Sequence, residues 1–241
     1  MTIHIPLAVG CNVDDLLPKA YELAAKLQAT LDNNASPRLH LTADSLALIM
    51  EPFTPLQADF SMKTWQPRRD AGKNQGLIRA CKPQKGMTII DATAGWGRDA
   101  AILASFGAKV VMLERCPWMC ALLQDALERQ DANSRKLLQL ELVPQDAIKY
   151  LQNLSIQDYP DLIFIDPMHP ERTQSALVKK ELQVLQMMIG PDNDAATLLH
   201  LAQSRVKQRV VVKWPQRLPP LGLPNHIVKG KTVRFDVYFN L

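Results

Sequence analysis

The stretch Thr88–Asp99 reads TIIDATAGWGRD, and it decides the fold. It starts as a short apolar run, passes through Gly95 and Gly97, and ends in a helical pattern. Glycine suits such a turn because the chain bends sharply there and a ligand must approach the backbone without meeting a Cβ atom. A strand, a glycine turn and a helix in this order predict a nucleoside-binding site at the carboxyl end of the strand.

The chain from residue 85 onward alternates short apolar runs with longer helical patterns, which is typical of βαβ units around a mostly parallel sheet. Residues 233–240 read VRFDVYFN, an alternation that suits a last, antiparallel strand. The expected class is therefore α/β. We expect the other strands at 87–91, 109–114, 137–143, 161–166 and 209–214, and helices at 98–105, 117–129, 146–153, 175–188 and 192–207.

The first 80 residues have a different character. A helical pattern covers 14–31, and two short runs at 38–41 and 45–51 are expected to pair as a hairpin ahead of a basic stretch. We place a domain boundary near residue 80, with the alternative that so small an N-terminal unit packs on the main sheet instead of standing free. Residues 1–80 would form a small N-terminal α+β unit that could contact RNA, and residues 81–241 the main domain.

Composition restricts the class of protein. The chain has 241 residues, 47% of them hydrophobic, so it can bury a core without disulfides or metals. No apolar run approaches the roughly 18 to 20 residues that cross a bilayer, and no signal-peptide pattern begins the sequence. Its four cysteines show no C-x-x-C spacing. We expect a cytoplasmic protein with reduced thiols and no bound metal, no membrane partner and a monomeric state.

Charge is segregated along the sequence. Residues 63–85 hold seven Lys and Arg against one acid, and residues 203–241 hold eight against one. Together these two segments carry +13, so the rest of the chain carries −9 within a net charge of +4. Such segregation is expected if one surface meets a polyanion, although solvated surface charge explains it about equally well.

Glu114 extends the glycine-turn pattern. It lies 19 residues after Gly95, at the end of the next expected strand. A carboxylate at that place can accept hydrogen bonds from both hydroxyls of a ribose. An ordinary tight loop is the alternative for a lone glycine turn, but strand, turn, helix, strand and acid together favour a nucleoside cofactor.

The acids beside the turn indicate which cofactor binds. Dinucleotide-binding turns complete G-x-G-x-x-G and face a pyrophosphate, whereas the third position here is Ala100. Asp91 ends the strand and Asp99 lies just inside the helix. Two anions there would repel a pyrophosphate but suit the cationic amino-acid tail of S-adenosylmethionine (SAM). We therefore expect SAM.

A third cofactor contact is expected after the third strand. The segment Val143–Ala147 places Asp146 at a strand end, where it could accept a hydrogen bond from the exocyclic amine of an adenine. Asp146 could equally be the N-cap of the helix that follows, and the two roles are compatible.

The reacting end of the site is expected at Asp166. An apolar strand stops there and continues as Pro167, Met168, His169 and Pro170. Prolines restrict the backbone and remove amide donors, so carbonyl groups and the Asp166 carboxylate can face a donor such as an exocyclic amine. His169 could be a base, could stack on a nucleobase or could only pack in the loop; we favour stacking or packing.

Several motifs in order resemble the ribosomal RNA small subunit methyltransferase J family. The chain departs from the family pattern at His169, where members usually carry an aromatic residue, and in the loop before Asp146. The motifs are Asp91–Asp99, Met112–Arg115, Asp166–Pro170, Ser175–Glu181, Gly190–Asp192, Arg209–Lys213, Lys229–Gly230 and Arg234–Asp236. They span residues 91–236, whereas the first 60 residues match loosely.

This resemblance implies a Rossmann-like class I SAM-dependent methyltransferase fold, with a mostly parallel seven-stranded sheet and an antiparallel last strand. It implies methylation of the exocyclic N2 of a specific guanosine in 16S ribosomal RNA of the small subunit. By motif matching, it places the cofactor contacts at Arg98, Asp99, Glu114, Arg115, Asp146, Ala147 and Asp166. The glycine turn and the strand before it add Asp91, Gly95 and Gly97 as candidate cofactor contacts. Asp166, Pro167 and His169 are the candidate catalytic residues.

Basic residues are the candidates for RNA phosphate contacts, which position a nucleic acid without specifying its sequence. Rival functions are an NAD-dependent oxidoreductase, a non-catalytic RNA-binding module, and a methyltransferase for a small molecule or another RNA. The candidate phosphate contacts are Lys63, Arg68, Arg69, Lys73, Arg79, Lys179, Lys180, Lys213 and Arg217.

Overall fold

The structure is a computed structural model that describes residues 7–168, 180–190 and 192–240. The chain divides into two compact units, each assembled from separate stretches of sequence. Residues 60–81 belong to the second unit, and a separate folding domain that ends near residue 80 stays a prediction. Unit 1 comprises Met1–Asp59, Cys116–Arg129 and Met168–Pro191; unit 2 comprises Phe60–Arg115, Gln130–Pro167 and Asp192–Leu241.

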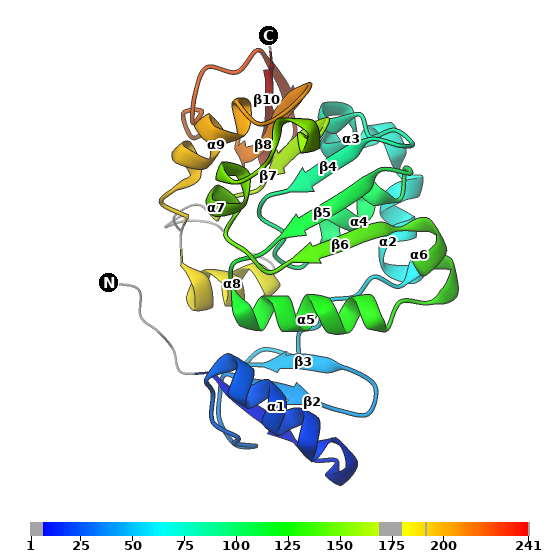
Figure 1. Cartoon of the computed structure of the whole chain (residues 1–241), viewed down its shortest axis with the longest axis vertical. Helices are drawn as coiled ribbons and strands as arrows, with labels where there is room; N and C mark the ends of the chain where they lie inside the picture. The colour runs from blue at the N-terminus through cyan, green and yellow to red at the C-terminus, as the bar shows by residue number, and fades with distance from the viewer. Residues whose placement is uncertain (1–6, 169–179, 191, 241) are drawn as a thin grey trace. The chain divides into compact units, whose positions relative to one another are not determined.

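Unit 1 contains a small sheet of three strands among its described residues, in the order β1-β2-β3 (Figure 1). The expected hairpin is confirmed, because β2 (Arg38–Leu41) pairs antiparallel with β3 (Leu46–Ile49). An unexpected strand, β1 (Ala8–Cys11), pairs parallel with β2. The expected N-terminal helix is confirmed in shorter form, as η1 (Asp14–Leu16) and α1 (Leu17–Leu27). Helices α5 (Pro117–Glu128) and α8 (Lys180–Ile189) complete the unit.

Unit 2 is built on a seven-stranded sheet in the order β6-β5-β4-β7-β8-β10-β9. The first five strands in that order are parallel, and β10 runs antiparallel to both of its neighbours, so the expected fold class is confirmed. Strand β9, unlike the others, was not expected, because only Val228 of its four residues is buried. The strands are β4 (Thr88–Asp91), β5 (Lys109–Leu113), β6 (Gln139–Val143), β7 (Leu162–Ile165), β8 (Arg209–Pro215), β9 (His226–Lys229) and β10 (Val233–Phe239).

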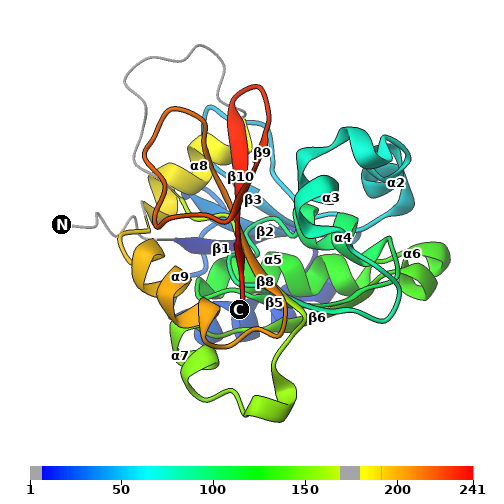
Figure 2. The same ribbon diagram turned by 90° about the horizontal axis from the view of Figure 1, so that it is seen from above.

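Helices cover both faces of this sheet (Figure 2). One face packs buried side chains of the strands, Ile90, Ile163 and Val210, against Leu198 and Ala202 of the helical layer. That layer consists of α7 (Ala147–Gln152) and α9 (Ala195–Gln203). The opposite side carries α2 (Met62–Asp70), α3 (Gly76–Cys81) and α4 (Arg98–Ala104); α6 (Ala132–Leu137) precedes β6, and η2 (Gly72–Asn74) and η3 (Ile156–Asp158) are short connections.

Strand order places the site. From β4 the chain proceeds to β5 and β6 on one side and later returns to β7 and β8 on the other. In open α/β sheets, ligands bind beyond the carboxyl ends of the strands at such a switch point. The carboxyl ends of β4 and β7 are also tied together, because the amide of Asp166 donates a hydrogen bond to Oγ1 of Thr93 at 2.7 Å.

Three further features concern the described residues: the burial of the cysteines, helices that could cross a membrane, and clusters of metal-binding side chains. Cys11, Cys81 and Cys120 are buried, and Cys116 is partly buried. Within the described parts of the chain, no helix combines the length and the apolar character that crossing a membrane requires. No cluster of three or more His, Cys, Asp or Glu side chains suited to a metal ion occurs there either.

Candidate active site

The glycine turn has the predicted geometry. Gly95 and Gly97 have φ values of 51° and 70°, a backbone region that favours glycine. The amide of Gly97 donates to the carbonyl oxygen of Ala94 at 2.8 Å, which closes the turn before α4 begins at Arg98. Among the described residues, the atom nearest to a Cβ built on Gly95 is the carbonyl oxygen of Thr93 at 3.9 Å, so these residues leave room beside Gly95.

Glu114 lies against this turn. It follows β5 directly, and only 7% of its surface is exposed. Its Oε2 atom accepts a hydrogen bond from the amide of Gly95 at 3.1 Å. The turn and the acid that the sequence predicts to share a ribose are therefore adjacent, and the hydrogen bond orients the carboxylate.

Asp91 is in surroundings that disfavour its charged form. Its side chain at the end of β4 is 1% exposed. Burial raises the pKa of Asp91 to about 8, and the nearby carboxylates of Asp99 and Asp166 add to this rise, against the opposing effects of the Thr93 amide and Lys213. Burial therefore favours the protonated form of this carboxyl group in the chain without cofactor. From the sequence alone, Asp91 is expected to be an anion, because a sequence does not show desolvation.

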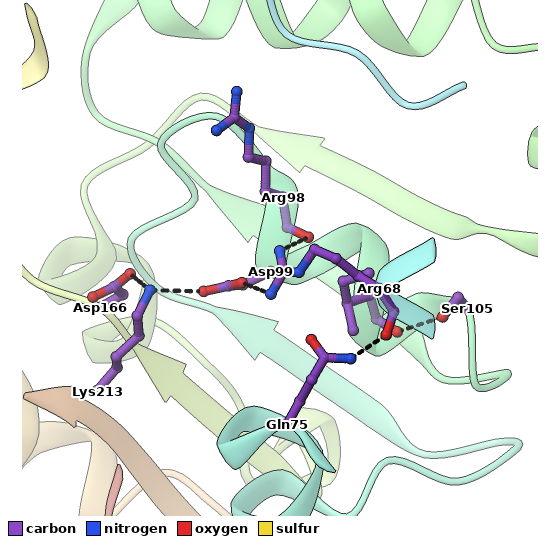
Figure 3. Close-up of polar contacts among 8 residues, drawn as sticks. Arg68, Gln75, Arg98, Asp99, Ser105, Asp166 and Lys213 are labelled. Carbon is purple, nitrogen blue, oxygen red and sulfur yellow. Dashed lines mark hydrogen bonds and ion pairs between the residues drawn. The ribbon is translucent and has the colours of Figure 1, made fainter. Parts of the chain in front are cut away.

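Asp99 is ionised, but two cations balance its charge (Figure 3). Nη2 of Arg68 lies 2.7 Å from Oδ1 of Asp99, and Nζ of Lys213 lies 3.0 Å from Oδ2. Burial acts to raise the pKa of Asp99, but Lys213 and Arg68 outweigh it and hold the pKa at about 2. Because its charge is already paired, Asp99 would repel a pyrophosphate less strongly than an unpaired carboxylate would.

Asp166 follows β7, and its carboxylate is also bound to Lys213. The Nζ atom of Lys213 lies 2.5 Å from Oδ2 of Asp166 (Figure 3). Ile165 of β7 pairs with Val212 of β8, so Asp166 and Lys213 are the next residues in register. Pro167 is buried directly behind Asp166. Sequence reasoning missed this pair because it depends on which strands are neighbours.

Asp146 caps α7, as one of its two expected roles requires. Its Oδ1 atom accepts a hydrogen bond from the amide of Lys149 at 3.1 Å. Arg115 lies beside it, with Nη1 at 3.6 Å from Oδ2 of Asp146 and 2.7 Å from Oδ2 of Asp194. Arg115 also forms an ion pair with Asp192. Asp192 and Asp194 were not expected here; they connect the segment before α9 to the ends of β5 and β6.

The remaining cofactor candidates differ in how deeply they are buried. Ala147 is buried at the start of α7, next to Asp146. Arg98 is exposed, and its side chain extends away from Asp99 (Figure 3). His169 lies outside the described residues, so its stacking or packing stays a prediction.

The candidate RNA contacts fall into two groups. Lys63, Arg79 and Arg217 are exposed and Arg69 is partly exposed, and Nη2 of Arg79 donates to the carbonyl oxygen of Lys229 at 3.2 Å. Arg68 and Lys213 are instead held by carboxylates, which the expectation of phosphate contacts did not anticipate. Lys179 lies outside the described residues, as do the side chains of Lys73 and Lys180.

Comparison with known proteins gives consistent results. A family model of SAM-dependent methyltransferases matches residues 22–240. The chain is 57% identical over 231 residues to ribosomal RNA small subunit methyltransferase J of Legionella pneumophila, covering 96% of this chain and 95% of the relative. It is 39% identical to the protein of that name from Chromohalobacter salexigens, with the same coverage. A crystal structure of a SAM-dependent methyltransferase from Neisseria gonorrhoeae is 25% identical, with a TM-score of 0.75 over 97% of this chain and 96% of that one.

Proposed function

The chain belongs to the SAM-dependent ribosomal RNA small subunit methyltransferase J family, and on this premise we propose that it methylates the exocyclic N2 of a guanosine in 16S ribosomal RNA. The observation that carries the proposal is the position of Asp166. This acid directly follows β7, and its amide donates to Oγ1 of Thr93, two residues before Gly95, at the edge where a ligand in an open α/β sheet is expected. An acceptor group and a nucleoside cofactor can therefore meet at one place.

The residues around the turn fit SAM. Glu114 is already oriented by Gly95 and can accept hydrogen bonds from the ribose hydroxyls. Asp91 can pair with the cationic amino-acid tail, because a cation beside a carboxyl group lowers its pKa and favours the ionised form. Oδ1 of Asp146 caps α7, whereas Oδ2 lies beside Arg115 at the place proposed for the adenine. The residues proposed to hold the cofactor are Asp91, Gly95, Gly97, Arg98, Asp99, Glu114, Arg115, Asp146, Ala147 and Asp166.

The chemistry that this chain must supply is mainly positioning. When bound, SAM supplies an electrophilic methyl group on a sulfonium, which the lone pair of the amine nitrogen takes as the carbon–sulfur bond breaks. Asp166 accepts a hydrogen bond from the N2 group, with help from the carbonyl groups near Pro167, and holds its lone pair toward the methyl carbon. One N2 proton then leaves to solvent. Holding two reactants in line can lower a barrier by up to about 7–11 kcal/mol.

The RNA must present an accessible base. A guanine stacked in a helix cannot reach Asp166, so it must be flipped out or already unpaired, at a cost of a few kcal/mol. The exposed cations Lys63, Arg79 and Arg217 and the partly exposed Arg69 are the proposed phosphate contacts. His169 is proposed to stack on the base or to pack in its loop. We further propose that the protein acts as a monomer in the cytoplasm, where ribosomal subunits are made.

Nucleoside analysis tests this function in cells. In a strain that lacks the gene, 16S ribosomal RNA should lose one N2-methylguanosine, and a plasmid copy of the wild-type gene should restore it. A plasmid copy with Asp166→Ala should not restore it. Unchanged N2-methylguanosine in the deletion strain would contradict the proposal and favour the alternative, a methyltransferase that acts on a small molecule or another RNA.

A further inference from the structure

Lys213 has surroundings that a phosphate contact does not explain. Its Nζ atom lies 2.5 Å from Oδ2 of Asp166 and 3.0 Å from Oδ2 of Asp99 (Figure 3). Its side chain is only 28% exposed. A lysine that binds phosphates through simple attraction keeps a mobile, solvated ammonium group. The ammonium group of Lys213 is instead shared between two acids of the active site.

The two acids come from different parts of unit 2. Asp166 ends β7 at the proposed acceptor side, whereas Asp99 lies in the first turn of α4, two residues after Gly97 of the cofactor turn. Arg68 of α2 binds the other oxygen of Asp99 at 2.7 Å. An unbroken series of ion pairs, Arg68–Asp99–Lys213–Asp166, thus joins α2, α4, β8 and the end of β7.

We propose that Lys213 is a positioning residue for methyl transfer, whose ammonium group fixes the Asp166 carboxylate against Asp99 so that Asp166 faces the acceptor amine. This inference rests on the proposed function. Without the cation, the carboxylates of Asp99 and Asp166 would repel each other beside the buried Asp91. In this role Lys213 acts through Asp166.

The charge state of Lys213 agrees with this role. Burial acts to lower the pKa of Lys213, but Asp166 and Asp99 outweigh burial and raise the pKa above its ordinary value. Lys213 is therefore a cation at neutral pH. It is a fixed charge and not a proton acceptor.

Steady-state kinetics of two variants test the role. Lys213→Met keeps the length of the side chain and removes its charge. We expect kcat to fall about 100-fold, since a displacement of about 1 Å can cost that much, while KM for RNA changes less than about threefold. Lys213→Arg keeps the charge, and its kcat should be at least about tenfold higher than that of Lys213→Met. The control Lys207→Met replaces an exposed lysine two residues before β8 and should behave as wild type.

Other kinetic outcomes overturn the proposal. Equal kcat for the wild type and Lys213→Met would do so. So would a loss confined to KM with a weaker salt dependence, which is the behaviour of a phosphate contact. In an Asp166→Asn background, Lys213→Met should reduce kcat by a further factor of less than about three, because the lysine acts through Asp166. A further loss of about 100-fold in that background would show that Lys213 acts elsewhere.

A measurement without RNA separates this inference from the proposed function. Carbon-13 NMR of labelled aspartate should show that Asp99 titrates at about 2 in the wild type and at a clearly higher pH in Lys213→Met, because one of its two cations is gone. An unchanged Asp99 titration would show that the ion pair is absent and would overturn the inference. Lack of methyl transfer to RNA by the wild type would instead overturn the proposed function.

Discussion

The amide of Gly95 donates a hydrogen bond to Oε2 of Glu114 at 3.1 Å, across 19 residues of sequence. This contact joins the turn after β4 to the end of β5, the neighbouring parallel strand. It orients a nearly buried carboxylate before any ligand binds. Because a preorganised acceptor loses less conformational entropy on binding, Glu114 should contribute strongly to cofactor affinity.

Glu114→Gln should weaken SAM binding about 10- to 100-fold, since hydrogen bonds to a charged acceptor contribute about 1.5–3 kcal/mol. Isothermal titration calorimetry measures this directly. The matched control is Glu141→Gln, which changes an exposed glutamate of β6 and should leave the affinity unchanged. An equal affinity for wild type and Glu114→Gln would rule out Glu114 as the ribose acceptor.

Asp91 should make the stability of the protein depend on pH. Its pKa is about 8 in the folded chain and about 3.9 when unfolded. Between these values the folded chain binds more protons than the unfolded chain, so the free energy of unfolding should fall as pH rises from about 4 to about 8.

Urea unfolding at several pH values between 5 and 8 tests this dependence. Asp91→Asn, which cannot titrate, should remove a slope of up to about 1.4 kcal/mol per pH unit. The exposed control Asp44→Asn should retain the wild-type slope. If Asp91→Asn had the same slope as the wild type, Asp91 would be ionised in the folded chain and the proposed protonation state would be wrong.

Two substitutions of Asp146 should separate its roles. Asp146→Ala removes the cap of α7 and should cost about 1 kcal/mol of stability. Asp146→Ser keeps a capping oxygen, so stability should recover, whereas SAM affinity should stay low because the shorter side chain no longer reaches the adenine. Thermal unfolding and calorimetry with SAM give the two readouts. Full SAM affinity in Asp146→Ser would restrict Asp146 to capping.

Arg68 and Arg69 are adjacent on α2 but should behave differently. Arg69→Glu should weaken RNA binding and reduce its salt dependence while SAM affinity stays constant, because phosphate contacts release counterions. Arg68→Glu should also change SAM affinity, since it removes one of the two cations on Asp99. Filter binding at several salt concentrations, with calorimetry for SAM, makes the comparison. Identical profiles for both variants would contradict the assignment of Arg68 to the site.

Local sequence was enough to predict the glycine turn, Glu114 and the cap at Asp146. Each depends on a strand followed by a turn or helix, and the residues involved are set by short, regular spacings. The alternation in 233–240 likewise predicted β10 correctly. Strand β1 was missed because all four of its residues are buried and its sequence shows no alternation, and β9 was missed because three of its four residues are exposed.

The rest of the site depends on long-range packing. Lys213 meets Asp166 only because β7 and β8 are neighbours in register, and a sequence pattern does not specify that order. The raised pKa of Asp91 follows from complete burial, which no local motif reveals. Asp192 and Asp194 reach Arg115 across 77 and 79 residues. In each case the sequence shows the residue type, but it does not show which distant residues that side chain contacts in the folded chain.

Transfer of radiolabelled methyl from SAM to small ribosomal subunits, or to their 16S RNA, from a strain lacking the gene tests the central claim most directly. Nucleoside analysis then identifies the labelled atom. We predict label in N2-methylguanosine with the wild type and a loss of at least about 100-fold with Asp166→Ala that still binds SAM. No label with the wild type, or label that persists at the wild-type rate with Asp166→Ala, would contradict the account.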